Sequence, residues 1–208
     1  MICHRNRMIF IHLPRTGGSS IEEALTGYDW WLADSQKKHL DWKQAKKIYA
    51  SEWDHYLKFS VVRNPWSLVV SLYYSHSQLR ARPKFLEKGP GRFRKWWPAK
   101  GWQEWLTAPR MADWEQDLFA NKSPMADCIG PEVDVILRTE SLQEDFDCMT
   151  EKHLGRKLSL PWSEKMGVSN RKHTEKHYST YYNSEQAELI RSRFRHDLER
   201  FGYEFERL

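Results

Sequence analysis

The side chains best suited to chemistry near the start of the chain are one cation and several hydroxyls in a glycine-rich turn. Residues 8–25 read MIFIHLPRTGGSSIEEAL, in which Arg15, Thr16, Ser19 and Ser20 surround two glycines. A guanidinium group and hydroxyls bind the oxygens of phosphate and sulfate groups, and glycine lets the backbone approach such an anion closely. The pattern therefore predicts a cradle for a phosphate group.

The residues around this turn predict a strand that leads into a helix. Residues 8–13 are an apolar run of strand length, and Pro14, Gly17 and Gly18 interrupt it. The first N–H groups of a helix have no partner inside the helix, and the helix dipole favours an anion beside them. An ordinary glycine-rich turn between a strand and a helix is the alternative for this stretch.

The predicted helix after the turn has recognisable start and stop signals. We expect Ser19 or Ser20 to cap its first turn, with Glu22 or Glu23 completing a capping box. Gly27 is the expected end of the helix.

A second candidate anion site follows another strand, predicted at residues 57–62. Arg63 ends this strand, Asn64 and Pro65 are suited to begin a helix, and Ser71 lies further along that helix. Ligands of open parallel sheets bind at the carboxyl ends of strands, and a guanidinium can hold a phosphate with two hydrogen bonds. An arginine that only stabilises its own helix start is the alternative.

Together the two turns resemble the donor-binding segments of sulfotransferases that use PAPS (3′-phosphoadenosine 5′-phosphosulfate). PRTGGSS, at residues 14–20, is similar to the family's 5′-phosphosulfate loop, and RNPWSLVVS, at residues 63–71, is similar to its 3′-phosphate motif. The resemblance implies that the following residues bind PAPS: Pro14, Arg15, Thr16, Gly17, Gly18, Ser19, Ser20, Arg63 and Ser71.

The cradle departs from the family's commoner pattern, which has Lys where this chain has Arg15. Arginine keeps the positive charge but does not lose a proton in proteins. The resemblance therefore implies that Arg15 stabilises negative charge on the departing phosphate as a cation, without donating a proton.

Two later stretches extend the resemblance toward the C-terminus. VDVILRTESLQEDF, at residues 133–146, is similar to a strand and helix of the family that carry a structural glutamate. Residues 168–182 resemble the late loop that closes on the 3′-phosphate in its carbohydrate sulfotransferases, which implies that Ser169, Arg171 and Lys172 bind the donor. A solvated basic turn is the alternative for this loop. Within the family, the chain resembles the group that includes heparan sulfate 2-O-sulfotransferases.

The acceptor hydroxyl needs a base, and histidine is suited to that role near neutral pH. The chain has nine histidines, and KHLDW around His39 resembles the family's GH element that supplies the base, with Lys38 in place of glycine. The resemblance thus implies His39 and Arg15 as the catalytic residues. His55 is the alternative base, and His12 is expected to pack in the core.

The composition is that of one basic domain rich in tryptophan. The chain has 208 residues, with 33 Lys and Arg against 28 Asp and Glu, which gives a net charge of +5. This length favours a single domain at residues 1–208, and the positive charge suits an anionic ligand. The chain has an unusual number of tryptophans, eleven, and we expect some of them in the core and others to stack on sugars or other rings.

Residues 80–125 contain a basic, aromatic stretch that is rich in Pro and Gly, RARPKFLEKGPGRFRKWWPAKG. We expect an insertion here that binds the acceptor, with Trp96, Trp97 and Trp102 as contacts, because long loops in compact domains are often functional. The family implies a carbohydrate hydroxyl as the acceptor.

Two other classes of function are compatible with parts of the sequence. The insertion would suit a nucleic-acid-binding module, in which bases stack on tryptophan and phosphates contact Arg and Lys. The glycine-rich turn would suit a P-loop-like nucleotide kinase, although the GxxxxGK[ST] motif is absent. The sulfotransferase interpretation explains both strand-to-helix turns and implies no nucleic-acid partner.

Alternating strands and helices predict an α/β fold. The resemblance implies a three-layer fold like that of P-loop NTPases, with a central, mostly parallel sheet flanked by helices. The remaining expected elements are a short strand at 29–34, a helix after Asp41, a buried strand at 133–137, a helix at 141–154 and a last helix from Ser184 to Gly202.

The cysteines indicate a reducing compartment. Cys3, Cys128 and Cys148 are odd in number and widely spaced, which fits neither a disulfide framework nor a zinc site. No apolar run approaches the roughly 18 residues of a transmembrane helix. We therefore expect a cytoplasmic protein that requires no metal.

Overall fold

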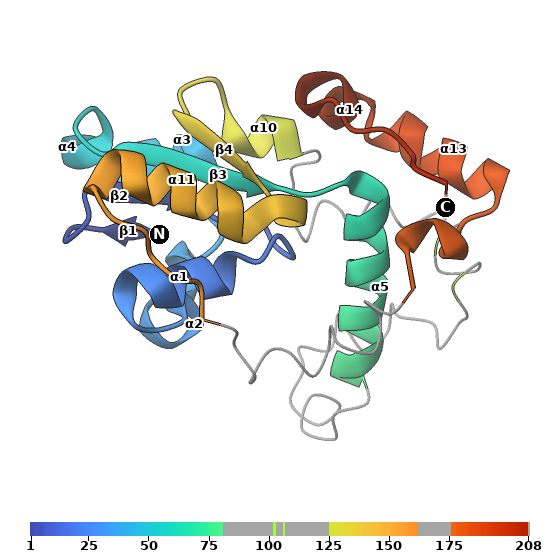
Figure 1. The fold of residues 1–208 in the computed structure, drawn as a ribbon, viewed down its shortest axis with the longest axis horizontal. Coiled ribbons are helices and arrows are strands. Elements are labelled where there is room, and N and C mark those ends of the chain that lie inside the picture. Colours follow the sequence, from blue (N-terminus) through green and yellow to red (C-terminus); the bar gives the residue numbers. More distant parts are fainter. Residues whose placement is uncertain (81–101, 103–105, 107–124, 162–175, 208) are drawn as a thin grey trace.

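A computed structural model describes residues 1–80, 102, 106, 125–161 and 176–207, with the backbone alone at 75–80. It has three layers, a central and mostly parallel sheet between two layers of helices, which confirms the expected α/β class (Figure 1). The prediction of one domain at 1–208 with an insertion at 80–125 stays a prediction, because most of that insertion lies outside the described residues.

The elements of the described segments follow in chain order. The strands are β1 (Ile2–Cys3), β2 (Met8–Ile11), β3 (Leu57–Val62) and β4 (Val135–Arg138). The α-helices are α1 (Gly18–Thr26), α2 (Trp30–Ala33), α3 (Trp42–Ile48), α4 (Ala50–Trp53), α5 (Pro65–Arg80), α10 (Met125–Ile129), α11 (Leu142–Leu154), α13 (Ser184–Arg193) and α14 (Arg195–Phe201). The 3₁₀ helices are η1 (Ser35–Lys37), η2 (Thr139–Ser141) and η3 (Tyr178–Tyr181).

The sheet order is β1-β2-β3-β4, and β2, β3 and β4 run parallel while β1 is antiparallel to β2. Phe59 of β3 lies opposite Phe10 on one side and Val135 on the other. Because the carboxyl ends of parallel strands meet at one edge of the sheet, the segments after β2, β3 and β4 lie together there. Both anion-binding turns expected from the sequence begin at this edge.

Alternate residues of β2 pack on opposite layers of helices. Phe10 stacks on Phe59 at a centroid distance of 4.8 Å, and both belong to the cluster packed against α1 and α11. Ile9 and Ile11 point the other way and pack with Trp53 and other residues of α3 and α4. All four residues of β2 are therefore buried, as expected of a central parallel strand.

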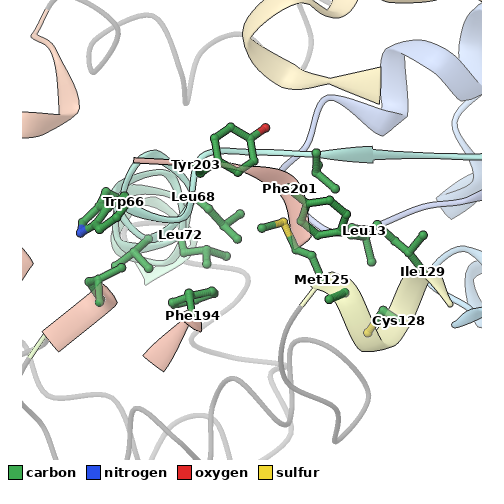
Figure 2. Packing of buried hydrophobic residues seen from close by; sticks show 14 of the residues in the cluster. Leu13, Trp66, Leu68, Leu72, Met125, Cys128, Ile129, Phe194, Phe201 and Tyr203 are labelled. Atoms are coloured by element: carbon green, nitrogen blue, oxygen red, sulfur yellow. The ribbon is translucent and has the colours of Figure 1, made fainter. Parts of the chain in front are cut away.

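A third apolar cluster fixes α5, the helix that follows β3. Trp66, Leu68 and Leu72 of α5 pack with residues of α10, α13 and α14 and with Phe194, which lies between the last two helices (Figure 2). The indole N–H of Trp66 donates to the carbonyl of Ala187 at 2.9 Å. The C-terminal helices thus hold α5, and with it Ser71, against the end of the sheet.

Two strands differ from the sequence-based expectation. Residues 29–34 form helix α2 and not a strand, because the Asp29 carboxylate accepts a hydrogen bond from the Trp31 N–H at 2.8 Å and caps a helical turn. The expected buried strand at 133–137 is β4, which is the edge strand of the described sheet and leaves Ile136 37% exposed. The Asp134 carboxylate pairs with the backbone N–H of Lys58 just before β4 begins.

Helix boundaries were predicted best where a cap acts locally. Asp41 caps α3 in a full capping box, and α1 and the last helix end at glycines in the left-handed conformation, as expected. The predicted serine cap of α1 was wrong: Gly17, with φ of 87°, is its N-cap. The predicted last helix is two helices, α13 and α14, separated at Phe194, and Asn183 rather than Ser184 caps the first.

A buried carboxylate on α14 holds α10 against the C-terminal helices. Asp197 is fully buried and accepts hydrogen bonds from the backbone N–H groups of Met125 and Ala126 at 3.1 and 2.7 Å. Burial raises the pKa of Asp197 to about 7, although the two N–H groups act in the opposite direction. Asp197 thus satisfies the N-terminus of α10 from another helix.

Replacing Asp197 tests this contact. Asp197→Ala should lower the free energy of unfolding by about 1–3 kcal/mol, because two buried N–H groups lose their acceptor. The pKa of an aspartate is about 3.9 in the unfolded chain, whereas that of folded Asp197 is about 7. The contribution of Asp197 to the free energy of unfolding should therefore fall as pH rises between these two values. Urea unfolding across that range measures both effects. Glu199→Ala, at an exposed position of the same helix, is the control, and equal effects of the two changes would contradict the assignment.

Candidate functional site

The turn between β2 and α1 has an unusual backbone. Arg15 has φ of 67° and Gly17 has φ of 87°, so two of its residues are left-handed. Left-handed backbone is uncommon for a residue other than glycine and is often found at functional sites. The buried hydroxyl of Thr16 donates to the Leu13 carbonyl at 2.8 Å and holds the turn closed. The N-terminus of α1 therefore opens at the carboxyl edge of the sheet, where the cradle was expected.

The two glycines of the turn are required by close contacts. A Cβ atom on Gly18 would lie 2.3 Å from the His12 ring, and one on Gly17 would lie 2.6 Å from Leu142. Each distance is far below van der Waals contact. Gly18 thus allows the His12 imidazole to pack directly against the start of α1. Pro14, Ser19 and Ser20 complete the turn as half-buried residues.

The structure brings the two predicted anion-binding turns into direct contact. The Nε of Arg15 donates to the Ser71 hydroxyl at 3.1 Å. Arg63 donates from Nη1 to the backbone carbonyl of Arg15 and from Nε to the Ser67 hydroxyl, each at 3.0 Å. Sequence reasoning missed Ser67, which lies in the first turn of α5, four residues after Arg63.

Two partly buried guanidinium groups therefore lie side by side. Burial lowers the pKa of Arg63 to about 10, with a further contribution from the charge of Arg15, and burial also lowers the pKa of Arg15. Both groups stay charged at neutral pH and repel each other. An anion beside them would offset that repulsion and form charge-assisted hydrogen bonds, so this pair can hold phosphate groups.

The segment after β4 makes hydrogen bonds to both turns of the site. The Thr139 hydroxyl lies 3.1 Å from the carbonyl of Thr16 and 3.0 Å from that of Val62, within donating distance of both. The Glu140 carboxylate accepts from the Asn64 backbone N–H at 2.7 Å and from the Tyr203 hydroxyl at 3.0 Å. Glu140 therefore has the structural contacts that the resemblance implied.

His39 lies beside this cradle, and one of its ring nitrogens makes a hydrogen bond to the backbone. Its Nδ1 is 3.0 Å from the backbone carbonyl of His12, and a carbonyl can only accept, so Nδ1 carries the hydrogen. The other nitrogen, Nε2, then carries the lone pair that a general base needs. Burial lowers the pKa of His39 to about 3, and the charges of His12 and Lys38 act in the same direction, so the ring is neutral at physiological pH.

A buried ionic cluster joins His39 to the cradle helix. The ammonium of Lys38 is 2.5 Å from both Glu22 and Asp29 and 3.2 Å from the Ser19 hydroxyl. The other carboxylate oxygen of Glu22 lies 2.6 Å from Nδ1 of His12. Glu22, which was expected to take part in a capping box, is thus a buried partner of two basic side chains. Lys38 and Glu22 are 1% and 0% exposed.

The other predicted site residues are placed as follows. His55, the alternative base, precedes β3 and so lies at the amino edge of the sheet, opposite the cradle. Trp102 is half-buried, with its ring centroid 5.2 Å from those of both Tyr73 and Tyr182. Its predicted contact with the acceptor stays a prediction. The other predicted residues that lie outside the described part of the chain are Trp96, Trp97, Ser169, Arg171 and Lys172.

Sequence reasoning missed Trp31, whose ring centroid lies 5.6 Å from that of His39. The two residues are eight positions apart and belong to segments without a shared period, so no local pattern connects them. The unusual tryptophan content was the one available signal.

The comparisons with known proteins bear on the whole chain. A sequence model described as "Sulfotransferase family" matches residues 1–204. Neither the curated proteins nor the solved structures give a match. Within the described segments, none of the helices combines the length and apolar composition needed to span a bilayer. Within the same segments, His, Cys, Asp and Glu side chains form no cluster of three or more that could hold a metal ion.

Replacing Glu22 tests the ionic cluster. Burial opposes the ionisation of Glu22, but the hydrogen bonds and charges of His12 and Lys38 outweigh it and lower its pKa. Glu22→Gln should lower the free energy of unfolding at neutral pH by about 3–5 kcal/mol. The reason is that the buried ammonium of Lys38 loses one of its carboxylate partners.

The pH dependence of this effect has a definite sign. A carboxylate with a depressed pKa stabilises the fold above its unfolded pKa of about 4.3, and this contribution is lost as pH falls through the folded value. The difference between the wild type and Glu22→Gln should therefore shrink in acid, as measured by urea unfolding at neutral and acidic pH. Glu23→Gln, at the exposed neighbouring position, is the matched control. A pH-independent difference would contradict the assignment.

Proposed function

This chain belongs to the sulfotransferase family, and we propose that it transfers the sulfuryl group of PAPS to a hydroxyl group with His39 as the base. Sulfuryl transfer is the chemistry of the family. The proposal depends most on one observation, the convergence of Arg15, Arg63 and Ser71 at the carboxyl ends of β2 and β3. These side chains come from separate segments and present charges and hydroxyls suited to phosphate groups.

In this proposal the two turns hold opposite ends of the donor. Residues 14–20, with the N-terminus of α1, bind the 5′-phosphosulfate, and Arg63 and Ser71 bind the 3′-phosphate. Ser67 joins them, because its hydroxyl already contacts Arg63. Ser169, Arg171 and Lys172 complete the 3′-phosphate site, as the family resemblance implies.

The reaction needs a base, an in-line attack and a stabilised leaving group. PAPS supplies a sulfuryl group bonded to a phosphate oxygen. Nε2 of His39 accepts the proton of the acceptor hydroxyl. The hydroxyl oxygen forms a bond to sulfur as the bond between sulfur and the phosphate oxygen breaks. Arg15 and the N-terminus of α1 stabilise the charge that grows on that phosphate. The products are a sulfate ester, PAP (3′-phosphoadenosine 5′-phosphate) and a proton on His39.

The finer parts of the proposal come from the family and the composition. A carbohydrate hydroxyl is the proposed acceptor, with Trp96, Trp97 and Trp102 among its contacts. A cytoplasmic location and independence from metals remain predictions from the cysteine pattern and the chemistry. Family membership argues against the nucleic-acid-binding module and the nucleotide kinase that parts of the sequence also suited.

Donor binding tests the 3′-phosphate site. PAP should raise the melting temperature far more than ATP, because ATP lacks the 3′-phosphate that Arg63 and Ser71 would hold. At a hundredfold excess over Kd, a ligand stabilises the fold by about 2.7 kcal/mol. Arg63→Ala should weaken PAP binding by about 2–5 kcal/mol, measured by calorimetry, while the fold survives.

Arg5→Ala is the matched control for this experiment, because Arg5 is an exposed arginine outside the two turns. It should leave PAP affinity unchanged. Equal shifts with PAP and ATP, or unchanged PAP binding by Arg63→Ala, would refute the 3′-phosphate site.

Replacing His39 tests the base. With an acceptor found by screening hydroxyl compounds against labelled PAPS, His39→Ala should lower kcat by roughly 10²–10⁴-fold. PAP affinity should hardly change, since the imidazole serves the acceptor. Because the pKa of His39 is lowered to about 3, the wild-type rate should not fall from protonation of this group between neutral pH and about pH 5.

His55→Ala is the control and should be nearly as active as the wild type, because His55 lies at the opposite edge of the sheet. An inactive His55→Ala together with an active His39→Ala would show that the base was assigned to the wrong histidine.

A further inference from the structure

Three neighbouring apolar side chains around α2 are exposed. Tyr28, Trp31 and Leu32 are 45%, 57% and 85% exposed, and they fall within five residues of sequence. Single exposed apolar residues are common on protein surfaces, whereas grouped ones usually mark a binding site.

The Trp31 ring is held in place by buried groups beneath it. The Trp30 side chain is buried in the core, and its backbone N–H donates to Glu22 at 3.1 Å. Asp29 caps α2 through the Trp31 N–H, and the Lys38 ammonium lies 5.6 Å from the centroid of the Trp31 ring. The ionic cluster that carries Lys38 therefore also supports Trp31, which presents a pre-organised apolar surface.

This surface adjoins the candidate base. The rings of Trp31 and His39 meet at an interplanar angle of 71°. Nδ1 of His39 is directed to the His12 carbonyl, which leaves Nε2 for a substrate. A molecule that packs on Trp31 would thus bring a hydroxyl group close to the base.

The charges around Trp31 do not favour an anionic molecule. Residues 29–38 contain two aspartates and two lysines, and these pair with one another and with Glu22. The three carboxylates outnumber the two ammonium groups, in a chain whose net charge is +5. An acidic substrate would gain little attraction here, whereas an uncharged one meets no penalty.

We propose that Trp31 and Leu32 bind the acceptor, and that the part of the acceptor they bind is an uncharged sugar ring. The C–H face of a pyranose packs on an indole ring as apolar surface, while its hydroxyls point outward toward His39. This inference rests on the proposed function, because it takes His39 to be the base. It adds an acceptor contact to those proposed for the insertion at 80–125. It also narrows the acceptor from carbohydrates in general to uncharged sugars.

The test compares uncharged and acidic sugars in the intact protein. Transfer from labelled PAPS is measured with the methyl glycosides of glucose, galactose and mannose, and with methyl glucuronide. The wild type should sulfate at least one neutral glycoside with a lower KM than the glucuronide. Trp31→Ala should raise that KM about tenfold, as expected for a contact of roughly 1.4 kcal/mol, with PAP binding unchanged.

Two further variants separate the ring contact from general effects. Trp31→Phe keeps an aromatic ring and should recover part of the affinity. Ile48→Ala changes another exposed apolar residue, 45% exposed on α3, and should leave KM unchanged.

Each contrary outcome has a distinct meaning. An unchanged KM in Trp31→Ala, a preference for the glucuronide, or no transfer to any neutral glycoside by a protein that binds PAP would overturn this inference and leave the donor site intact. Failure to bind PAP would instead overturn the proposed function, and this inference with it.

Discussion

One buried carboxylate, Glu22, connects the segments that make up the candidate site. Its two oxygens reach His12 after β2, the Lys38 ammonium before α3 and the backbone N–H of Trp30. Burying a carboxylate is costly unless hydrogen bonds and opposite charges compensate, and here both are present. Because the partners come from three segments, this cluster positions the cradle helix, α2 and the candidate base His39 relative to one another.

The opposite side of the cradle contains two neighbouring guanidinium groups, those of Arg15 and Arg63. Arg63 donates to a carbonyl and a hydroxyl, which are neutral acceptors, and the charge of neighbouring Arg15 contributes to lowering its pKa. Like charges held together destabilise the fold, and sites of this kind are common where a protein binds an anion. The site is thus divided between a cluster of paired charges that positions groups and two neighbouring guanidinium groups suited to bind phosphates.

This division fits the two positions at which the chain departs from the pattern that the resemblance implied. Lys38 stands where glycine is usual, and its ammonium is enclosed by Glu22 and Asp29, so its charge is used within the fold. Arg15 stands where lysine is usual, and it contacts Ser71 of the other turn. In the proposed reaction, Arg15 would stabilise the charge on the leaving phosphate without giving up a proton.

The sequence by itself determined the features that depend on near neighbours along the chain. Asp41 caps α3 and Asn64 begins α5, as the sequence predicted. Alternating strands and helices predicted the mostly parallel sheet and the edge at which the two turns meet. Only the tertiary structure showed that Glu22 is a buried partner of His12 and that Nδ1 of His39 contacts the His12 carbonyl. It also placed Trp31 beside the His39 ring. These features join residues 8 to 27 positions apart, and propensity and periodicity describe a few residues at a time, so packing alone decides which distant side chains meet.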